Sequence, residues 1–387
     1  MSEHDKEWPA VGRIAWLSGG LVAINEPGKS VKIEAGIGGP ILFSYQLNNF
    51  GSFFSTLVAQ GFSVIGATYI TDVEESQGIR TPEFRAYFAN QPKWRAFEMH
   101  QQWGQVAHAA SQRDKMALMD IASRIATELS YCESRLQSLS EAYAIQLGSK
   151  GRRGALNEEG GFQDSHSQRV YMSIHAMFWE IAVLRDYFAE FAAQFVFGIE
   201  KVTKFAKLVP ALAGRGLDRD ELAKMLLEAG NDAPPGWLTI FSKYRNLFTH
   251  SAPMEEVANV AFAQLTQVSL PDGRKIPEIY YPLPSDVIEI ARRRAAGWCH
   301  KSFEEFISDS IHRNRNLHRE TEPDALSYLH AVFEKMVAIA EMLILRSPLE
   351  PEMIHLTEKD IVGEVKMYRN GELVFQGNMN NSTGAAS

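Results

Sequence analysis

The spacing of apolar positions changes several times along the 387-residue chain. In residues 1–80, short apolar and β-branched runs such as Arg13–Ile24 and Ser30–Glu34 alternate with glycine and proline. Short runs that are bounded by turn residues are typical of β-strands. We therefore predict a small β-rich or mixed module over residues 1–80.

A helical period replaces this pattern from about Pro82. Apolar side chains then recur mostly every three or four positions, among them Met116, Met119, Ile121, Ile125, Leu129, Cys132 and Leu136. This spacing places them on one face of a helix and predicts a long helical segment over residues 81–150. The polar, glycine-rich residues 151–168 interrupt the period, and we predict a flexible linker there.

The second half of the chain begins with its most apolar helical stretch, within a helical region predicted over residues 169–350. Asn370 and Gly371 then separate two short alternating runs, which predicts a β-hairpin within residues 351–377, because a type I′ turn needs positive φ at both central positions. Residues 378–387 are small and polar, and we expect them to be disordered. The predicted fold class is mainly α, with a β-rich N-terminal module and a C-terminal hairpin.

Composition excludes several function classes. A formal net charge of -8 excludes a uniformly basic nucleic-acid wrapper, although it permits a local basic patch. Two cysteines supply neither a disulfide framework nor a zinc-finger set, and the HExxH, CxxC and GxSxG motifs are absent. We therefore predict no metal and no cofactor. Without a signal peptide or an uncharged stretch of ~20 residues, we expect a cytoplasmic protein that makes no membrane contact.

The helix predicted from Trp237 to about Ser251 contains the candidate catalytic residues. Its apolar positions fall on one face at ~100° per residue; they are Trp237, Ile240, Phe241, Tyr244 and Phe248. Asn246 and His250 are four residues apart and share the nearly opposite face. Arg245 lies at the edge of the apolar stripe, from where its long side chain reaches the polar side. A guanidinium, an amide and an imidazole are thus presented away from the local core.

This Arg-Asn-x-x-x-His segment resembles the motif of HEPN domains, helical folds of many prokaryotic ribonucleases and toxins. In that family an arginine is followed, after four to six residues, by a histidine, often with a polar residue directly after the arginine. Arg245, Asn246 and His250 match all three positions. The resemblance covers at most residues ~165–350 and implies an HEPN-like helical bundle. It also implies a homodimer in which the Arg–His pairs of two protomers meet in a shared cleft.

Acidic side chains lie in the apolar helix upstream of this motif. The first helix of HEPN domains often offers an acidic group to the site, so the resemblance implies that Glu180 or Asp186 orients the imidazole. A carboxylate bonded to one ring nitrogen would fix the histidine tautomer. Three tryptophans, Trp94, Trp103 and Trp179, lie in helical patterns and are predicted to be core residues rather than a stacking platform.

A second segment matches the same pattern. Arg313, Asn314 and His318 repeat the Arg-Asn-x-x-x-His spacing in a basic stretch. This stretch also contains Arg292, Arg293 and Arg294, which form a candidate RNA-binding patch. Because this copy lacks the apolar stripe, we favour the first copy and keep the second as an alternative site.

Three chemical tasks connect these residues to RNA cleavage. The attacking 2′-hydroxyl loses a proton, charge on the phosphoryl oxygens is stabilised, and the leaving 5′-oxygen gains a proton. Histidine suits proton transfer with a pKa of ~6.5, and arginine suits the phosphoryl oxygens. Taken with these roles, the HEPN resemblance implies a metal-independent endoribonuclease that acts on RNA.

By analogy with the family alone, we expect this enzyme to be a toxin or antiviral effector, with an antitoxin or regulatory protein as a partner. The alternative is a non-catalytic helical RNA-binding or protein-interaction module that keeps the HEPN fold. A third hypothesis is a regulatory protein whose N-terminal module binds a small ligand.

Overall fold

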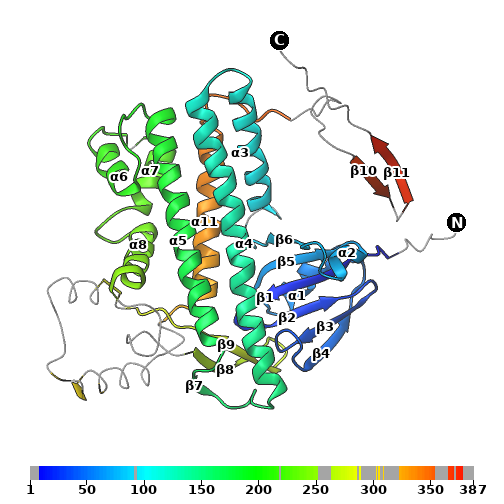
Figure 1. Ribbon diagram of the computed structural model, residues 1–387. Coiled ribbons are helices and arrows are strands. Elements are labelled where there is room, and N and C mark those ends of the chain that lie inside the picture. Colours follow the sequence, from blue (N-terminus) through cyan, green and yellow to red (C-terminus); the bar gives the residue numbers. More distant parts are fainter. Residues whose placement is uncertain are drawn as a thin grey trace, which may run out of the picture.

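The structure, a computed structural model, describes most of the chain. The described residues are 8–90, 94–217, 219–251, 263–285, 287–288, 322–353, 365–369 and 372–377, with positions 302, 304, 305 and 308. Long helices stand side by side and an antiparallel sheet lies against them (Figure 1). The prediction of a mainly α fold is confirmed, while the HEPN-like arrangement of the bundle stays a prediction.

The N-terminal module is a six-stranded antiparallel sheet with the order β4-β3-β2-β1-β5-β6. Its strands are β1 (Gly12–Leu17), β2 (Val22–Asn25), β3 (Ser30–Glu34), β4 (Ile41–Gln46), β5 (Val64–Ile70) and β6 (Glu83–Ala86). The short helices α1 (Phe53–Ala59) and α2 (Val73–Ser76) lie in its connections. The predicted β-rich module is therefore confirmed, and it extends six residues past position 80 because β6 pairs with β5.

The helical bundle is built from α3 (Arg95–Ser111), α4 (Met116–Arg152), α5 (Ser167–Phe191) and α11 (Ala325–Ile344). The apolar face predicted on α4 is buried at Ile121, Ile125, Leu129, Cys132 and Leu136, whereas Met116 is exposed. The segment predicted as one long helical run is two helices, because the chain reverses between α3 and α4. Asp114 allows this reversal by adopting a left-handed conformation at φ 53°.

A second antiparallel sheet, of order β7-β8-β9, closes one end of the bundle. Its strands are β7 (Gly160–Phe162), β8 (Ala263–Ser269) and β9 (Lys275–Tyr280). The prediction of a flexible linker over residues 151–168 is wrong at β7, which pairs with β8 about a hundred residues later. Local composition contains no information about so distant a partner.

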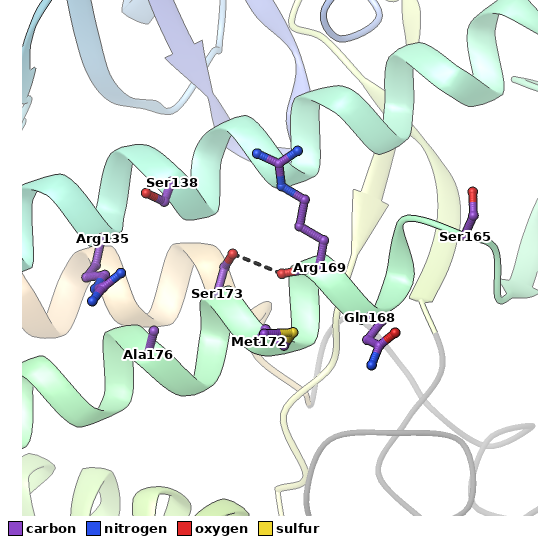
Figure 2. A pocket seen from close by; sticks show the side chains of 8 residues that line it. All are labelled: Arg135, Ser138, Ser165, Gln168, Arg169, Met172, Ser173 and Ala176. Atoms are coloured by element: carbon purple, nitrogen blue, oxygen red, sulfur yellow. Dashed lines mark hydrogen bonds between the residues drawn. The ribbon is translucent and has the colours of Figure 1, made fainter. Parts of the chain in front are cut away.

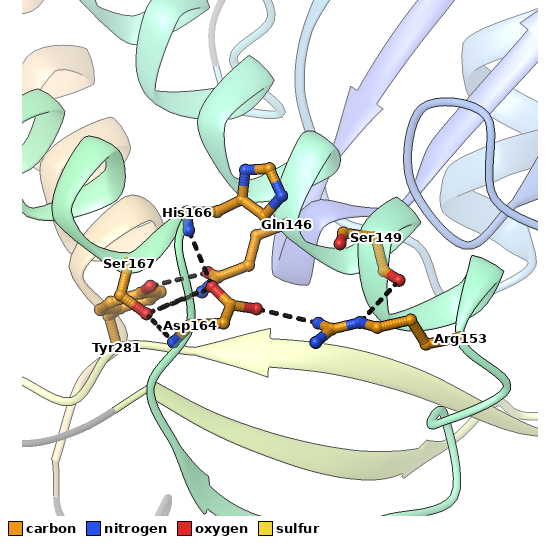
Figure 3. Close-up of polar contacts among 7 residues, drawn as sticks. All are labelled: Gln146, Ser149, Arg153, Asp164, His166, Ser167 and Tyr281. Atoms are coloured by element: carbon orange, nitrogen blue, oxygen red, sulfur yellow. Dashed lines mark hydrogen bonds and ion pairs between the residues drawn. The ribbon is translucent and has the colours of Figure 1, made fainter.

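Side chains on α4 also tie this segment down (Figure 3). Gln146 donates to the Asp164 carboxylate at 2.9 Å and to the Ser167 hydroxyl at 3.0 Å, and its oxygen accepts from the Tyr281 hydroxyl at 2.7 Å. Gln146, Ser167 and Tyr281 are buried, so these bonds satisfy polar groups that would otherwise lose their hydration. The network joins α4, α5 and the strand end after β9.

Two shorter helices, α6 (Phe205–Ala213) and α8 (Trp237–Asn246), lie against α5, and α7 (Glu221–Ala229) packs on both of them and on α11. Helix α8 continues into a π-helical turn over Leu247–Ser251. The predicted C-terminal hairpin is confirmed as β10 (Val365–Arg369) and β11 (Glu372–Gly377). Residues 378–387 lie outside the described residues. No helix in the described ranges combines the length and the hydropathy that crossing a membrane requires.

Glycines bring the N-terminal module into direct backbone contact with α4. The amide of Ile37 donates to the carbonyl of Ala144 at 3.0 Å. A Cβ at Gly148 would lie 2.3 Å from the Ile37 carbonyl oxygen, and one at Gly36, where φ is 78°, would lie 2.1 Å from the Ala144 oxygen. The close approach of sheet and helix therefore requires the absence of side chains at both glycines.

A buried carboxyl group strengthens the same interface. Glu133 of α4 accepts a hydrogen bond from the amide of Ala86, in β6, at 2.7 Å. Its side chain is buried, and this burial raises the pKa of Glu133 to about 7. The fold thus favours the protonated acid over the carboxylate at this position.

This raised pKa predicts a pH-dependent stability. Because the folded pKa lies above the ordinary value of 4.5, the contribution of Glu133 is fully present below pH 4.5 and is lost as the pH rises through about 7. Relative to wild type, Glu133→Gln should gain about 3 kcal/mol of unfolding free energy between pH 4.5 and 8. Urea unfolding at several pH values measures this difference, and a gap between wild type and variant that does not change with pH would contradict it.

Candidate active site at the end of helix α8

The first Arg-Asn-x-x-x-His segment lies where a helix changes its hydrogen-bonding pattern. Arg245 and Asn246 are the last residues of α8, and the backbone of His250 belongs to the π-helical turn that follows. Such π-helical insertions are frequent at functional sites. Because the α-helical register ends at Asn246, the four-residue spacing does not by itself place Asn246 and His250 on one face. The side chain of His250 lies outside the described residues.

An aromatic cluster fixes the rotation of α8 against α5. The ring of Phe178 lies 5.3 Å from the rings of both Phe241 and Phe248, and Tyr244 lies 6.3 Å away. These three residues of the predicted apolar stripe are buried, and Trp237 and Ile240 are half-buried at its margin. The stripe is therefore confirmed, and it places Arg245 at the edge of the buried face.

Arg245 is held in place by neutral groups. Its Nη1 donates to the Asn246 side-chain oxygen at 2.9 Å, and the guanidinium carbon lies 5.6 Å from the centre of the Trp179 ring. Its Nε is buried without a hydrogen-bond partner in the described part of the chain. An amide and an aromatic ring orient a guanidinium without neutralising its charge, so this group is suited to bind an anion.

A cavity of about 250 Å³ lies beside the same helix, between α5, α6 and α8. Asn246 and Lys243 line it from α8, and Arg185 lines it from α5. Arg185 donates to the Ser242 hydroxyl at 2.8 Å, which fixes its guanidinium at the cavity wall. Arg185 did not stand out in the sequence, because arginines within helices are common and no motif marks it.

The two acidic residues predicted to orient the imidazole make different contacts. Asp186 accepts from the Arg185 guanidinium at 2.9 Å and from the amide of Phe205 at 3.2 Å. It therefore fixes Arg185 and the start of α6. Glu180 accepts from Arg135 on α4 at 2.9 Å, so its carboxylate faces the other side of α5. The structure describes no contact between either residue and the imidazole, and their orienting role stays a prediction.

Glu180 also influences a second carboxyl group on α4. Burial and the hydrogen-bonded, negatively charged Glu180 together raise the pKa of Glu128 to about 8. Arg135 carries the opposite charge and bonds Glu180 from its exposed side. The buried environment thus favours the protonated form of Glu128, while Glu180 remains bonded to Arg135.

Trp179 is not the core residue that its helical position predicts. Trp103 is completely buried and Trp94 is half-buried, but Trp179 is 52% exposed. Its place on α5, between α4 and α8, cannot be recognised before the positions of both neighbouring helices are known. A large aromatic ring beside the motif arginine is therefore a feature that only the tertiary structure supplies.

The alternative copy of the motif and the basic patch are outside the described residues. They comprise Arg292, Arg293, Arg294, Arg313, Asn314 and His318. Among the residues that the structure does describe, no three His, Cys, Asp or Glu side chains gather as a potential metal site. No family model, no curated protein and no solved structure matches this chain.

Proposed function

We propose that this protein is a metal-independent endoribonuclease of the HEPN type. The observation that carries the proposal is the environment of Arg245. Asn246 and Trp179 orient its guanidinium group, and no carboxylate among the described residues pairs with it. This arginine precedes, by five residues, a histidine in a π-helical turn. The pairing of a permanent cation with a titratable ring suits phosphodiester cleavage.

In the proposed reaction, RNA supplies its own nucleophile. His250 removes the proton from the 2′-hydroxyl or delivers one to the departing 5′-oxygen, because its ordinary pKa is near 6.5. Arg245 stabilises the additional negative charge on the phosphoryl oxygens through its planar fork. Asn246 holds the guanidinium in position. The products are a 2′,3′-cyclic phosphate and a 5′-hydroxyl.

One Arg–His pair performs only part of this chemistry. A homodimer that joins two pairs in one cleft would supply one histidine as base and the second as acid. The homodimer follows from the family resemblance, as do the roles of toxin or antiviral effector and an antitoxin or regulatory partner. The alternative function is RNA binding without cleavage, in which the same surface binds RNA but no proton is transferred.

The proposal predicts cleavage of RNA in the presence of a chelator. Incubation of single-stranded RNA with the full-length protein in EDTA should give fragments that end in 2′,3′-cyclic phosphates. A strand in which each ribose is replaced by 2′-deoxyribose should remain intact, because it lacks the nucleophile. Mass spectrometry of the fragments identifies their ends. Cleavage of the deoxy strand, or binding of RNA without any cleavage, would contradict the proposed function.

A further inference from the structure

The exposed ring of Trp179 lies on α5 beside helix α8. On one side it meets Arg245 of α8. On the other side the adjacent residue, Glu180, holds Arg135 of α4 at 2.9 Å. Solvent-exposed tryptophans are uncommon, because the indole ring gains much from burial. An exposed ring beside an arginine is an arrangement that a nucleic-acid base can use by stacking.

A groove of about 480 Å³ runs along α4 and α5 on the Arg135 side (Figure 2). Figure 2 shows Arg169 extending from α5 toward α4, with Arg135 at the other end of the groove. Ser138, Ser165, Ser173 and Gln168 contribute hydrogen-bonding side chains to its lining. Both arginines are exposed. The lining therefore combines two guanidinium groups, one of which is also paired with Glu180, with small polar groups that can bond a phosphate backbone.

Helix geometry places the aromatic ring next to the groove. Ala176, at one end of the groove, lies one helical turn before Trp179 on α5. Ten residues separate Arg169 from Trp179, which corresponds to about 15 Å along the helix axis. A strand that leaves the site near Arg245 can therefore cross Trp179 and continue past Arg135 toward Arg169.

We propose that this path binds single-stranded RNA. One base stacks on Trp179, and the phosphates that follow contact Arg135 and Arg169. The inference rests on the proposed function, since it names the form of RNA that the same site takes. Single-stranded RNA fits because its bases are free to stack on an aromatic ring, whereas the base faces of a duplex are covered by their neighbours.

Charge favours RNA over a protein partner at this surface. Met172 is an exposed apolar residue of the groove, but arginines, serines and a glutamine surround it. The core of a protein interface is depleted in charged groups, whereas a single-strand path combines cations with an isolated aromatic platform. The experiment must still distinguish RNA binding from the binding of a second copy of the chain at this face.

The test uses an RNA that cannot be cleaved. A fluorescent 2′-O-methyl strand of about 12 nucleotides lacks the nucleophile, so its affinity is independent of catalysis. Trp179→Ala should weaken its binding about tenfold, while Trp179→Phe, which keeps an aromatic face, should retain most of the affinity. The double variant Arg135→Ala/Arg169→Ala should bind more weakly. The slope of the logarithm of its binding constant against the logarithm of salt concentration should become shallower by about 1.4.

Matched controls make the outcome specific. Arg215 is also exposed, but it bonds the carbonyl of Phe197 beyond the far end of α5, so Arg215→Ala should bind like wild type. Unchanged affinity in Trp179→Ala would overturn the proposal, as would an equal loss for a duplex. A change in oligomeric state at unchanged RNA affinity would instead assign this face to a protein contact. Trp179-dependent binding without any RNA cleavage would uphold this inference and reject the proposed nuclease.

Discussion

Replacement of His250 by alanine is expected to lower the rate of RNA cleavage by about 10²- to 10⁴-fold, the range that general acid–base catalysis contributes. Arg245→Ala should lower it by about 10²- to 10³-fold, because one preoriented donor to the phosphoryl oxygens is lost. Arg245→Lys should recover part of this loss, since lysine keeps the charge but not the planar fork. Single-turnover rates in EDTA measure all three effects without interference from product release.

The neighbouring Thr249 provides a matched control. It is exposed in the same π-helical turn, so Thr249→Ala should change the rate less than about twofold. Arg313→Ala and His318→Ala should also be neutral if the first copy of the motif is the active one. Full activity in both first-copy variants, with loss in the second-copy variants, would transfer the catalytic roles to Arg313 and His318.

Gly148→Ala is expected to destabilise the protein, although alanine is the better helix former. In the interior of α4, the new Cβ would lie 2.3 Å from the Ile37 carbonyl oxygen and force the N-terminal module away from the helix. The cost of such overpacking is about 1–3 kcal/mol. Because the new Cβ meets backbone atoms that cannot rotate away, we expect a cost above the gain of about 1 kcal/mol in helix propensity. The midpoint of urea unfolding should therefore fall.

Gly104→Ala in α3 is the matched control. A Cβ at Gly104 meets no atom within 4 Å, so the same substitution should raise the free energy of unfolding by about 0.5–1 kcal/mol. A loss of stability in Gly148→Ala together with a gain in Gly104→Ala would demonstrate that the N-terminal module contacts α4 directly. Equal stabilisation at both positions would refute this close approach.

Local patterns in the sequence account for the secondary structure well. The alternation of short runs with glycine and proline predicts the strands of the N-terminal module, and an Asn-Gly pair predicts the hairpin of β10 and β11. The apolar stripe of α8 predicts the face that packs on α5. Each of these features depends on residues within a few positions of one another, so a single sequence contains them. The Arg245–His250 spacing belongs to the same class.

Contacts between distant segments could not be predicted in this way. The partner of β7 lies about a hundred residues away, and the bond between Glu180 and Arg135 joins residues 45 positions apart on two helices. The same holds for Trp179, whose helical spacing predicts burial although its side chain is 52% exposed. Periodicity indicates which side chains share a face, but only the packing of helices and sheets decides what that face meets. The sequence by itself thus determined the elements and the candidate motif, and the tertiary structure decided which charges and rings surround it.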